Sequence, residues 1–127
     1  MKLLLDTHVW IWSHVAPERL PRRALSAITS SKHELWLSPI SIWEFQLLAD
    51  RGRIRVQGGL TPAAWVREAL NRAPMRDAPL TREVALRTRE VRLAHEDPAD
   101  RFLAATAAEY DLTLVTGNLR HFDRVPG

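Results

Sequence analysis

Hydrophobic positions along the chain follow two patterns, short continuous apolar runs and longer stretches with helical spacing. The apolar runs are typical of buried strands and lie at residues 2–5, 35–38 and 112–116, with a short extended piece at 75–78. Stretches with helical signals lie between them, at residues 9–15, 21–31, 39–50, 62–73, 81–93 and 98–110. Because strands and helices alternate, we expect an α/β fold with a central parallel sheet covered by helices on both faces.

The stretch from His95 to Ala108 joins acidic residues to a run of small apolar residues. Asp97 precedes Pro98, and these residue types suit the N-cap and the first position of a helix. Asp100 stands in the first turn and shares a helix face with the apolar positions three, four and seven residues on, which are Leu103, Ala104 and Ala107. We therefore expect the Asp100 carboxylate to point toward the core, where it needs a partner.

Four oxygen-bearing side chains are predicted to meet at one edge of the sheet. Asp6 ends the first strand, Asn118 follows the last, and Glu44 and Asp100 lie early in helices that start from the same edge. Clustered carboxylates repel one another unless a cation neutralises them, and Mg²⁺ or Mn²⁺ prefers such oxygen ligands. A cation held in this way activates water and stabilises charge on a phosphoryl oxygen, which is the chemistry of phosphodiester cleavage.

Each of these residues also has a structural interpretation. Asp6 can cap the helix that follows it, and Asn118 beside Gly117 is a common turn residue. Glu44 stands three residues after Ser41, which is the spacing of a capping box. The metal hypothesis therefore depends on the set of residues rather than on any one of them.

Composition sets broader limits. The 127 residues suit a single domain, residues 1–127, and the absence of cysteine excludes disulfides, thiolate metal sites and a cysteine nucleophile. The apolar run after Met1 is broken by Asp6 and is too short for a signal peptide or membrane span, so we expect a cytoplasmic protein. The net charge of +3, mostly from arginine, fits an anionic partner but also a solvated basic surface.

Four motifs resemble the successive motifs of a PIN domain, in that family's order and over essentially the whole chain. They are LLLDTH at residues 3–8, SPISIWE at 38–44, HEDPADR at 95–101 followed by AATA at 104–107, and LVTGN at 114–118 leading to Phe122. The third motif looks like that of the VapC-type toxins of bacterial and archaeal toxin–antitoxin pairs. The resemblance implies a PIN-like three-layer α/β/α fold.

The resemblance also implies an Mg²⁺- or Mn²⁺-dependent endoribonuclease in which metal-activated water attacks the phosphorus in line. Asp6, Glu44 and Asp100 match the acidic metal-binding positions of the family, and Asn118 matches its fourth, more variable position. Many relatives carry aspartate where this chain has Asn118, so the site here has less negative charge. The implied partners are an RNA substrate, a VapB-type antitoxin and a second copy of the chain in a homodimer.

Other residues near the expected ligands are assigned supporting roles. Thr116 is expected to orient the Asn118 side chain or a water, and Arg101 to pair with an acid or a phosphate. Asp97 supports the site behind its cap, and His8 and His95 are candidates to orient water or contact phosphate. The loop at residues 51–59, with three arginines and three glycines, is expected to touch substrate. Of the five tryptophans, most are expected in the core, while Trp10, Trp12 and Trp43 also suit an apolar patch for a partner.

Three functions are alternatives to the metal-dependent ribonuclease. A catalytically weak PIN-like module would bind RNA or a protein without cleaving it, if Asn118 leaves the metal site too weak. A histidine-based ribonuclease would need His8 and His95 as an acid–base pair, which nothing in the sequence brings together. A phosphohydrolase with an aspartyl nucleophile is disfavoured, because Asp6-Thr7-His8 lacks a second aspartate two residues on.

Overall fold

The fold is built on a parallel sheet, seen in a computed structural model that describes residues 1–91 and 97–116. Within these residues the sheet has four strands in the order β3-β2-β1-β4, all parallel. The strands are β1 (Lys2–Leu5), β2 (Glu34–Leu37), β3 (Arg76–Asp77) and β4 (Thr113–Val115). Leu3 of β1 lies opposite Leu35 on one side and Thr113 on the other, so β1 is a central strand.

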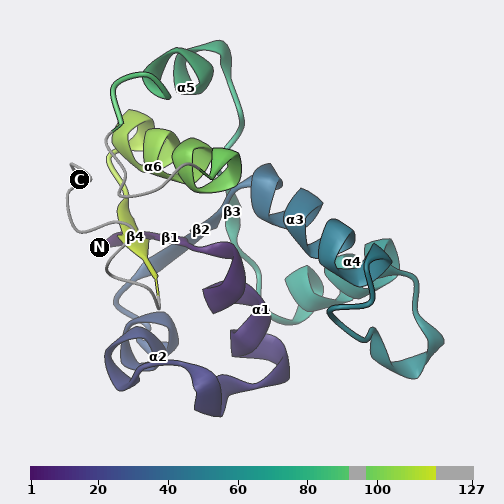
Figure 1. Ribbon diagram of the computed structural model, residues 1–127. Coiled ribbons are helices and arrows are strands. Elements are labelled where there is room, and N and C mark those ends of the chain that lie inside the picture. Colours follow the sequence, from purple (N-terminus) through teal and green to yellow (C-terminus); the bar gives the residue numbers. More distant parts are fainter. Residues whose placement is uncertain (92–96, 117–127) are drawn as a thin grey trace.

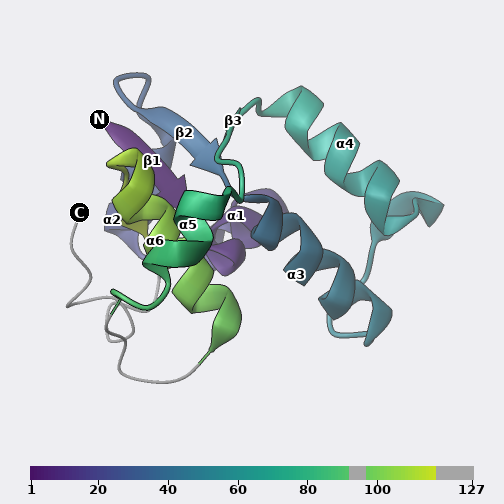
Figure 2. The same cartoon turned by 90° about the horizontal axis from the view of Figure 1, so that it is seen from above.

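Helices cover both faces of this sheet. They are α1 (Thr7–Val15), α2 (Arg22–Thr29), α3 (Pro39–Asp50), α4 (Pro62–Arg72), α5 (Arg82–Arg87) and α6 (Pro98–Tyr110), with 3-10 turns η1 (Pro17–Arg19) and η2 (Gln57–Gly59). Figure 1 shows α5 and α6 above the strands and α1 and α2 below them, while α3 and α4 extend to one side, as they also do in Figure 2. The expected three-layer α/β/α architecture with a central parallel sheet is confirmed. None of the helices in the described part of the chain is long and apolar enough to cross a lipid bilayer.

The central strand carries an apolar core on each side of the sheet. Leu5 belongs to a buried cluster with Trp10, Phe45 and Trp65, whereas Leu4 packs with Leu103 and Leu112 in a second cluster. Successive side chains of a strand point to opposite faces, so a strand buried on both faces needs a continuous apolar run. The apolar run and strand β1 therefore both end at Leu5, and the polar Asp6 follows.

Most helices begin where the sequence predicts. Ser38 Oγ accepts a hydrogen bond from the Ile40 N–H at 3.1 Å, Thr61 Oγ1 from Ala64 at 3.1 Å, and Asp97 Oδ1 from Ala99 at 3.0 Å. Each of these residues precedes a proline at the first helical position, which has no N–H to satisfy. The predicted role of Asp97 as the N-cap of α6 is therefore confirmed.

The helix expected over residues 81–93 was predicted too long, because α5 ends at Arg87. The Thr88 hydroxyl donates to the Ala85 carbonyl at 2.6 Å, inside the last turn. Arg101 Nη1, from α6, then donates to the carbonyls of Thr88 at 2.9 Å and Val91 at 3.1 Å. These carbonyls are satisfied by a side chain of another helix instead of by a continuing helical turn.

Candidate functional site

Asp6 is held at the junction of β1 and α1 by hydrogen bonds to both carboxylate oxygens. Oδ1 accepts from the His8 N–H at 3.3 Å and so caps α1, and Oδ2 accepts from Thr116 Oγ1 at 2.8 Å. Asp6 is 9% exposed and Thr116 is 7% exposed. Asp6 therefore has the structural role that its sequence context suggests, and its carboxylate is also fixed in orientation at the carboxyl edge of the sheet.

Glu44 lies within α3 and is held by a residue of α1. Its Oε1 accepts a hydrogen bond from Thr7 Oγ1, which also lies 2.8 Å from the buried Ser41 Oγ. The capping box considered for Ser41 and Glu44 does not form, because α3 begins earlier, at Pro39, with Ser38 as its cap. The structural alternative for Glu44 is thus excluded, and its carboxylate is available to the site.

The electrostatic environment of Glu44 links it to the other acids. Burial raises the pKa of its carboxyl above the ordinary value, and the charges of Asp6, Asp97 and Asp100 raise it further, while the hydrogen bond from Thr7 opposes the rise. These acids belong to the end of β1 and the start of α6. The charges that shift the pKa of Glu44 are all negative, as expected of a site that is completed by a cation.

The first turn of α6 brings Asp100 to the same edge. Asp100 is half-buried, and Leu103, Ala104 and Ala107, which share its helix face, are fully buried, so the predicted inward face is confirmed. Arg101, the next residue, was expected to pair with an acid or a phosphate. Its Nη1 donates to the backbone carbonyls after α5, so Arg101 fixes α6 against that segment, and its pairing with an acid or a phosphate stays a prediction.

The oxygen atoms of the three acids are of the kind that a hard divalent cation binds, but the three side chains are not grouped closely enough to hold one. Asp6, Glu44 and Asp100 offer only carboxylate oxygens, which Mg²⁺ and Mn²⁺ prefer. Yet within residues 1–91 and 97–116, no three histidine, cysteine, aspartate or glutamate side chains are grouped closely enough to hold a metal ion. Asn118 and His95, the other expected site residues, lie outside the described residues.

Comparison with known proteins assigns the chain to a family. A PIN domain model matches residues 3–127. The chain belongs to the PIN domain family. A curated relative, ribonuclease VapC22 of Mycobacterium tuberculosis, is 33% identical over 119 residues, which is 93% of this chain and 88% of the relative.

Solved structures agree with this assignment. A DNA-bound VapBC complex from Salmonella typhimurium matches with a TM-score of 0.69 and 25% identity, over 100% of this chain and 94% of that chain. VapBC2 from Rickettsia felis, bound to a promoter DNA fragment, has the same fold with a TM-score of 0.71 and 17% identity, over 99% of this chain and 94% of that chain. The resemblance to VapC-type toxins read from the motifs is confirmed.

Two threonines of this PIN domain have roles that the sequence did not reveal. Thr7 was noted only as part of the first motif, yet its hydroxyl holds Glu44. The Thr116 hydroxyl donates to Asp6, and its expected role toward Asn118 or a water stays a prediction, because Asn118 lies outside the described residues. A threonine directly after a site aspartate, or directly after a strand that ends at the site, is the signal that marks such positions.

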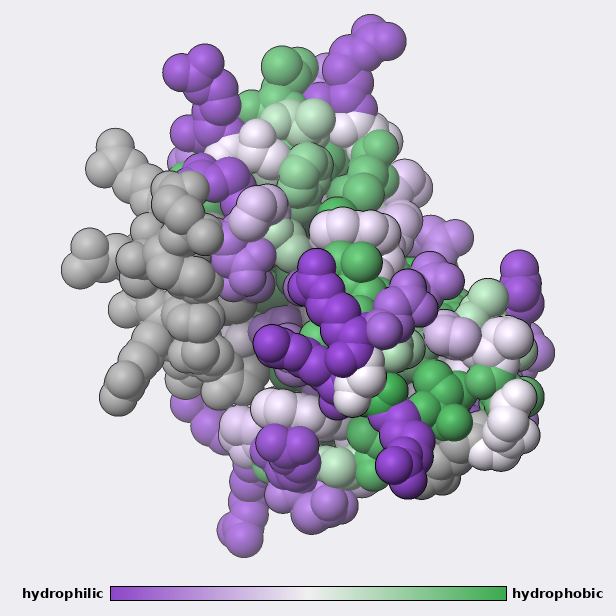
Figure 3. Space-filling model, turned by 45° about the vertical axis from the view of Figure 1, so that its right-hand side comes forward, coloured by the Kyte–Doolittle hydropathy of each residue, from purple (hydrophilic) through white to green (hydrophobic). Residues whose placement is uncertain are grey.

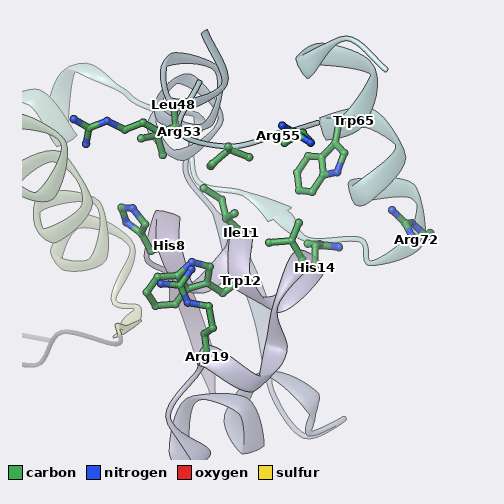
Figure 4. A pocket seen from close by; sticks show the side chains of 12 residues that line it. His8, Ile11, Trp12, His14, Arg19, Leu48, Arg53, Arg55, Trp65 and Arg72 are labelled. Atoms are coloured by element: carbon green, nitrogen blue, oxygen red, sulfur yellow. The ribbon is translucent and has the colours of Figure 1, made fainter. Parts of the chain in front are cut away.

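A cleft of about 550 Å³ lies between α1, the segment after α3 and α4 (Figure 4), and none of Asp6, Glu44 and Asp100 is among the residues that line it. His8 is exposed and lines this cleft, with its ring 5.7 Å from that of Trp12. The apolar patch considered for the tryptophans is not continuous: Trp10 is fully buried, Trp12 is half-buried in the cleft, and Trp43 is 51% exposed.

Proposed function

We propose that this PIN domain is the toxin endoribonuclease of a VapBC-type toxin–antitoxin pair, hydrolysing RNA phosphodiesters by attack of water. The family and its ribonuclease relative support the class of reaction. The observation that carries the proposal is that Asp6 and Glu44, from distant segments, are each held by a threonine hydroxyl, and that the charges of Asp6, Asp97 and Asp100 all act on Glu44. Such a region suits a cation and, through it, a phosphodiester.

In this proposal Asp6, Glu44 and Asp100 hold an Mg²⁺ or Mn²⁺ ion, and Asn118 supplies a fourth, neutral oxygen. When bound, the ion lowers the pKa of a water molecule and offsets charge on a phosphoryl oxygen. The protein's own contribution is orientation. Thr116 and the His8 N–H fix Asp6, Thr7 fixes Glu44, and the Asp97 cap fixes the first turn of α6, which carries Asp100.

The proposed partners follow from the relatives. Two of the matching structures are VapBC complexes, so a VapB-type antitoxin is the proposed regulator, and RNA is the proposed substrate. A homodimer is also part of this proposal, to be tested by light scattering of the purified chain. Toxicity predicts that expressing the chain without its antitoxin arrests growth.

The test is cleavage of a single-stranded RNA that carries a fluorophore and a quencher. We expect cleavage with Mg²⁺ or Mn²⁺, none in excess chelator, and none from the Asp100→Asn variant with either cation. Asp111→Asn is the matched control, because Asp111 is exposed at the far end of the same helix, with a φ of 55° that asparagine also adopts readily. Undiminished cleavage in excess chelator, or by Asp100→Asn, would overturn the metal-dependent mechanism.

The second candidate is a PIN-like module that binds RNA or protein without cleaving it. What favours it is the spacing of the acids, since no group of three potential ligands is preformed among the described residues. The same assay separates the two functions. RNA binding with no cleavage at any concentration of either cation would support the binding module.

A further inference from the structure

The cleft that begins at His8 carries a cluster of arginines. The arginines that line it, all exposed, are Arg19, Arg53, Arg55 and Arg72. Ion pairs in the described part of the chain join Arg76 to Glu34 and Arg87 to Glu109, so none of the cleft arginines is paired with a carboxylate there. Arginines without carboxylate partners, lining one concave surface, attract a polyanion.

The charge of one of these arginines, Arg72, acts on the wall of the cleft. His14 lines the cleft between the rings of Trp10 and Trp65, with ring centroids 6.2 Å and 5.6 Å away. Burial lowers the pKa of His14, and the charge of Arg72 lowers it further. Of the charges that line the cleft, that of Arg72 therefore reaches the wall at His14.

One wall of the cleft offers a flat surface for stacking. The Arg19 guanidinium carbon lies 4.6 Å from the centroid of the Trp12 ring, and Figure 4 shows the two side chains together on that wall. Guanidinium planes and aromatic rings are the groups on which proteins stack unpaired bases. An acidic peptide would use the charge of the arginines but not this planar pair.

One end of the cleft is lined by His8, two residues after Asp6 of the proposed catalytic site. His8 and Arg53 lie toward one end of it, and Arg55, Trp65 and Arg72 toward the other (Figure 4). The backbone N–H of His8 donates to Asp6, and the preceding Thr7 contacts Glu44. Figure 3 brings the side of α3 and α4 forward and shows hydrophilic and hydrophobic groups interleaved on this face, in contrast to one continuous apolar surface.

We propose that this cleft binds the single-stranded RNA that flanks the cleaved phosphodiester. Arg53 and Arg55 contact phosphates, and the Arg19–Trp12 pair stacks an unpaired base. The volume of about 550 Å³ lies within the range of roughly 300–1,000 Å³ for pockets that enclose one small ligand, so the cleft suits a nucleotide or two. This inference rests on the proposed function, because the bound strand is the substrate of the adjacent acids.

The test is binding, measured separately from cleavage. An unstructured 12-nucleotide RNA with a 5′-fluorescein is titrated with the full chain in EDTA, and fluorescence anisotropy gives Kd at several salt concentrations. We expect Arg53→Ala/Arg55→Ala to weaken binding at least tenfold. Losing two phosphate contacts on a single strand should also reduce the slope of log K against log salt by about 1.4. The same RNA annealed to its complement should bind more weakly than the single strand.

Two comparisons separate specific contacts from general charge. Arg22→Ala/Arg23→Ala removes the same charge from α2, on a surface shared with His33 before β2, at the opposite edge of the sheet. We expect this control to change Kd less than twofold. Arg19→Lys keeps the charge but removes the planar group, so it should weaken binding about fivefold or more without changing the salt slope.

Each contrary result overturns the inference. It fails if the Arg53/Arg55 double variant binds like the α2 control, if Arg19→Lys binds like the unmodified chain, or if duplex RNA binds as tightly as the single strand. It also fails if polyglutamate binds more tightly than RNA with the same variant dependence, which would make an acidic protein segment the occupant. A chain that cleaves RNA in Mn²⁺ but fails these binding tests refutes the cleft alone. A chain that passes them without cleaving refutes the catalytic proposal alone.

Discussion

The hydrogen bond between Thr116 and Asp6 joins the end of β4 to the end of β1 across 110 residues, at 2.8 Å and between buried side chains. Thr116→Val removes the hydroxyl donor and leaves a side chain of nearly the same shape. Any loss of stability therefore comes from the lost hydrogen bond and not from poorer packing. A hydrogen bond to a charged group contributes about 1.5–3 kcal/mol to stability. We therefore expect the variant to lower the free energy of unfolding by that amount, and to cleave RNA more slowly because Asp6 Oδ2 loses its hydrogen bond and only Oδ1 stays held, by the His8 N–H.

The stability change is measured by urea unfolding in EDTA. With a slope of about 1–3 kcal/mol per molar urea for a small protein, the midpoint should fall by about 1 M at unchanged slope. Thr116→Ser is the control, because it retains the hydroxyl and should recover most of both the stability and the cleavage rate. A valine variant with the original midpoint and rate would show that this bond positions nothing.

Three further predictions concern charge and cation binding. Burial, then neighbouring acids, raise the pKa of Glu44 above 4.5, so in EDTA the folded chain binds more protons than the unfolded chain. Its unfolding free energy should therefore fall as pH rises from 4.5 through the raised pKa, and urea titrations of Glu44→Gln should lack this component. Burial, then Arg72, lower the pKa of His14 below 6.5, so stability should fall as pH drops from 6.5 through the lowered pKa. His14→Phe should remove that loss, and an unchanged pH profile would contradict the assignment. Saturating Mn²⁺ at 100 times its Kd should add about 2.7 kcal/mol to the stability of the unmodified chain and of Asp111→Asn, but not of Asp100→Asn. Equal stabilisation of both variants would place the ion elsewhere.

Local chemistry explains why much of the fold could be predicted. The helix starts at Pro39, Pro62 and Pro98 follow from adjacent cap and proline residues, whose effect extends over only a few positions. The parallel sheet follows from apolar runs that lack alternation, because a strand buried on both faces needs no polar side. Asp6 was placed correctly at the end of β1 for the same reason.

The errors arise where a distant residue replaces a local partner. The end of α5 depends on Arg101, a residue of α6 that donates hydrogen bonds to backbone carbonyls of the segment after α5. The spacing of Ser41 and Glu44 suggested a local capping box, but Glu44 is held by Thr7 from α1. Neither contact leaves a periodic signal in the sequence, since each is made by the packing of separate elements.

In the proposed function, negative charges serve catalysis and positive charges serve RNA binding, and the hydrogen-bond partners of the acids show how the two are kept apart. Asp6 and Glu44 are held by neutral hydroxyls, which fix a carboxylate without cancelling its charge, whereas an arginine in the same place would form an ion pair. Four arginines that form no ion pair within the described residues line the cleft that begins at His8. In the proposed arrangement the RNA strand is held by the cleft, and its cleaved phosphate reaches a negative centre that repels it until a cation is present. Removing the cation should therefore abolish cleavage and leave strand binding in the cleft intact, and a chain that needs Mn²⁺ to bind RNA at all would contradict this division.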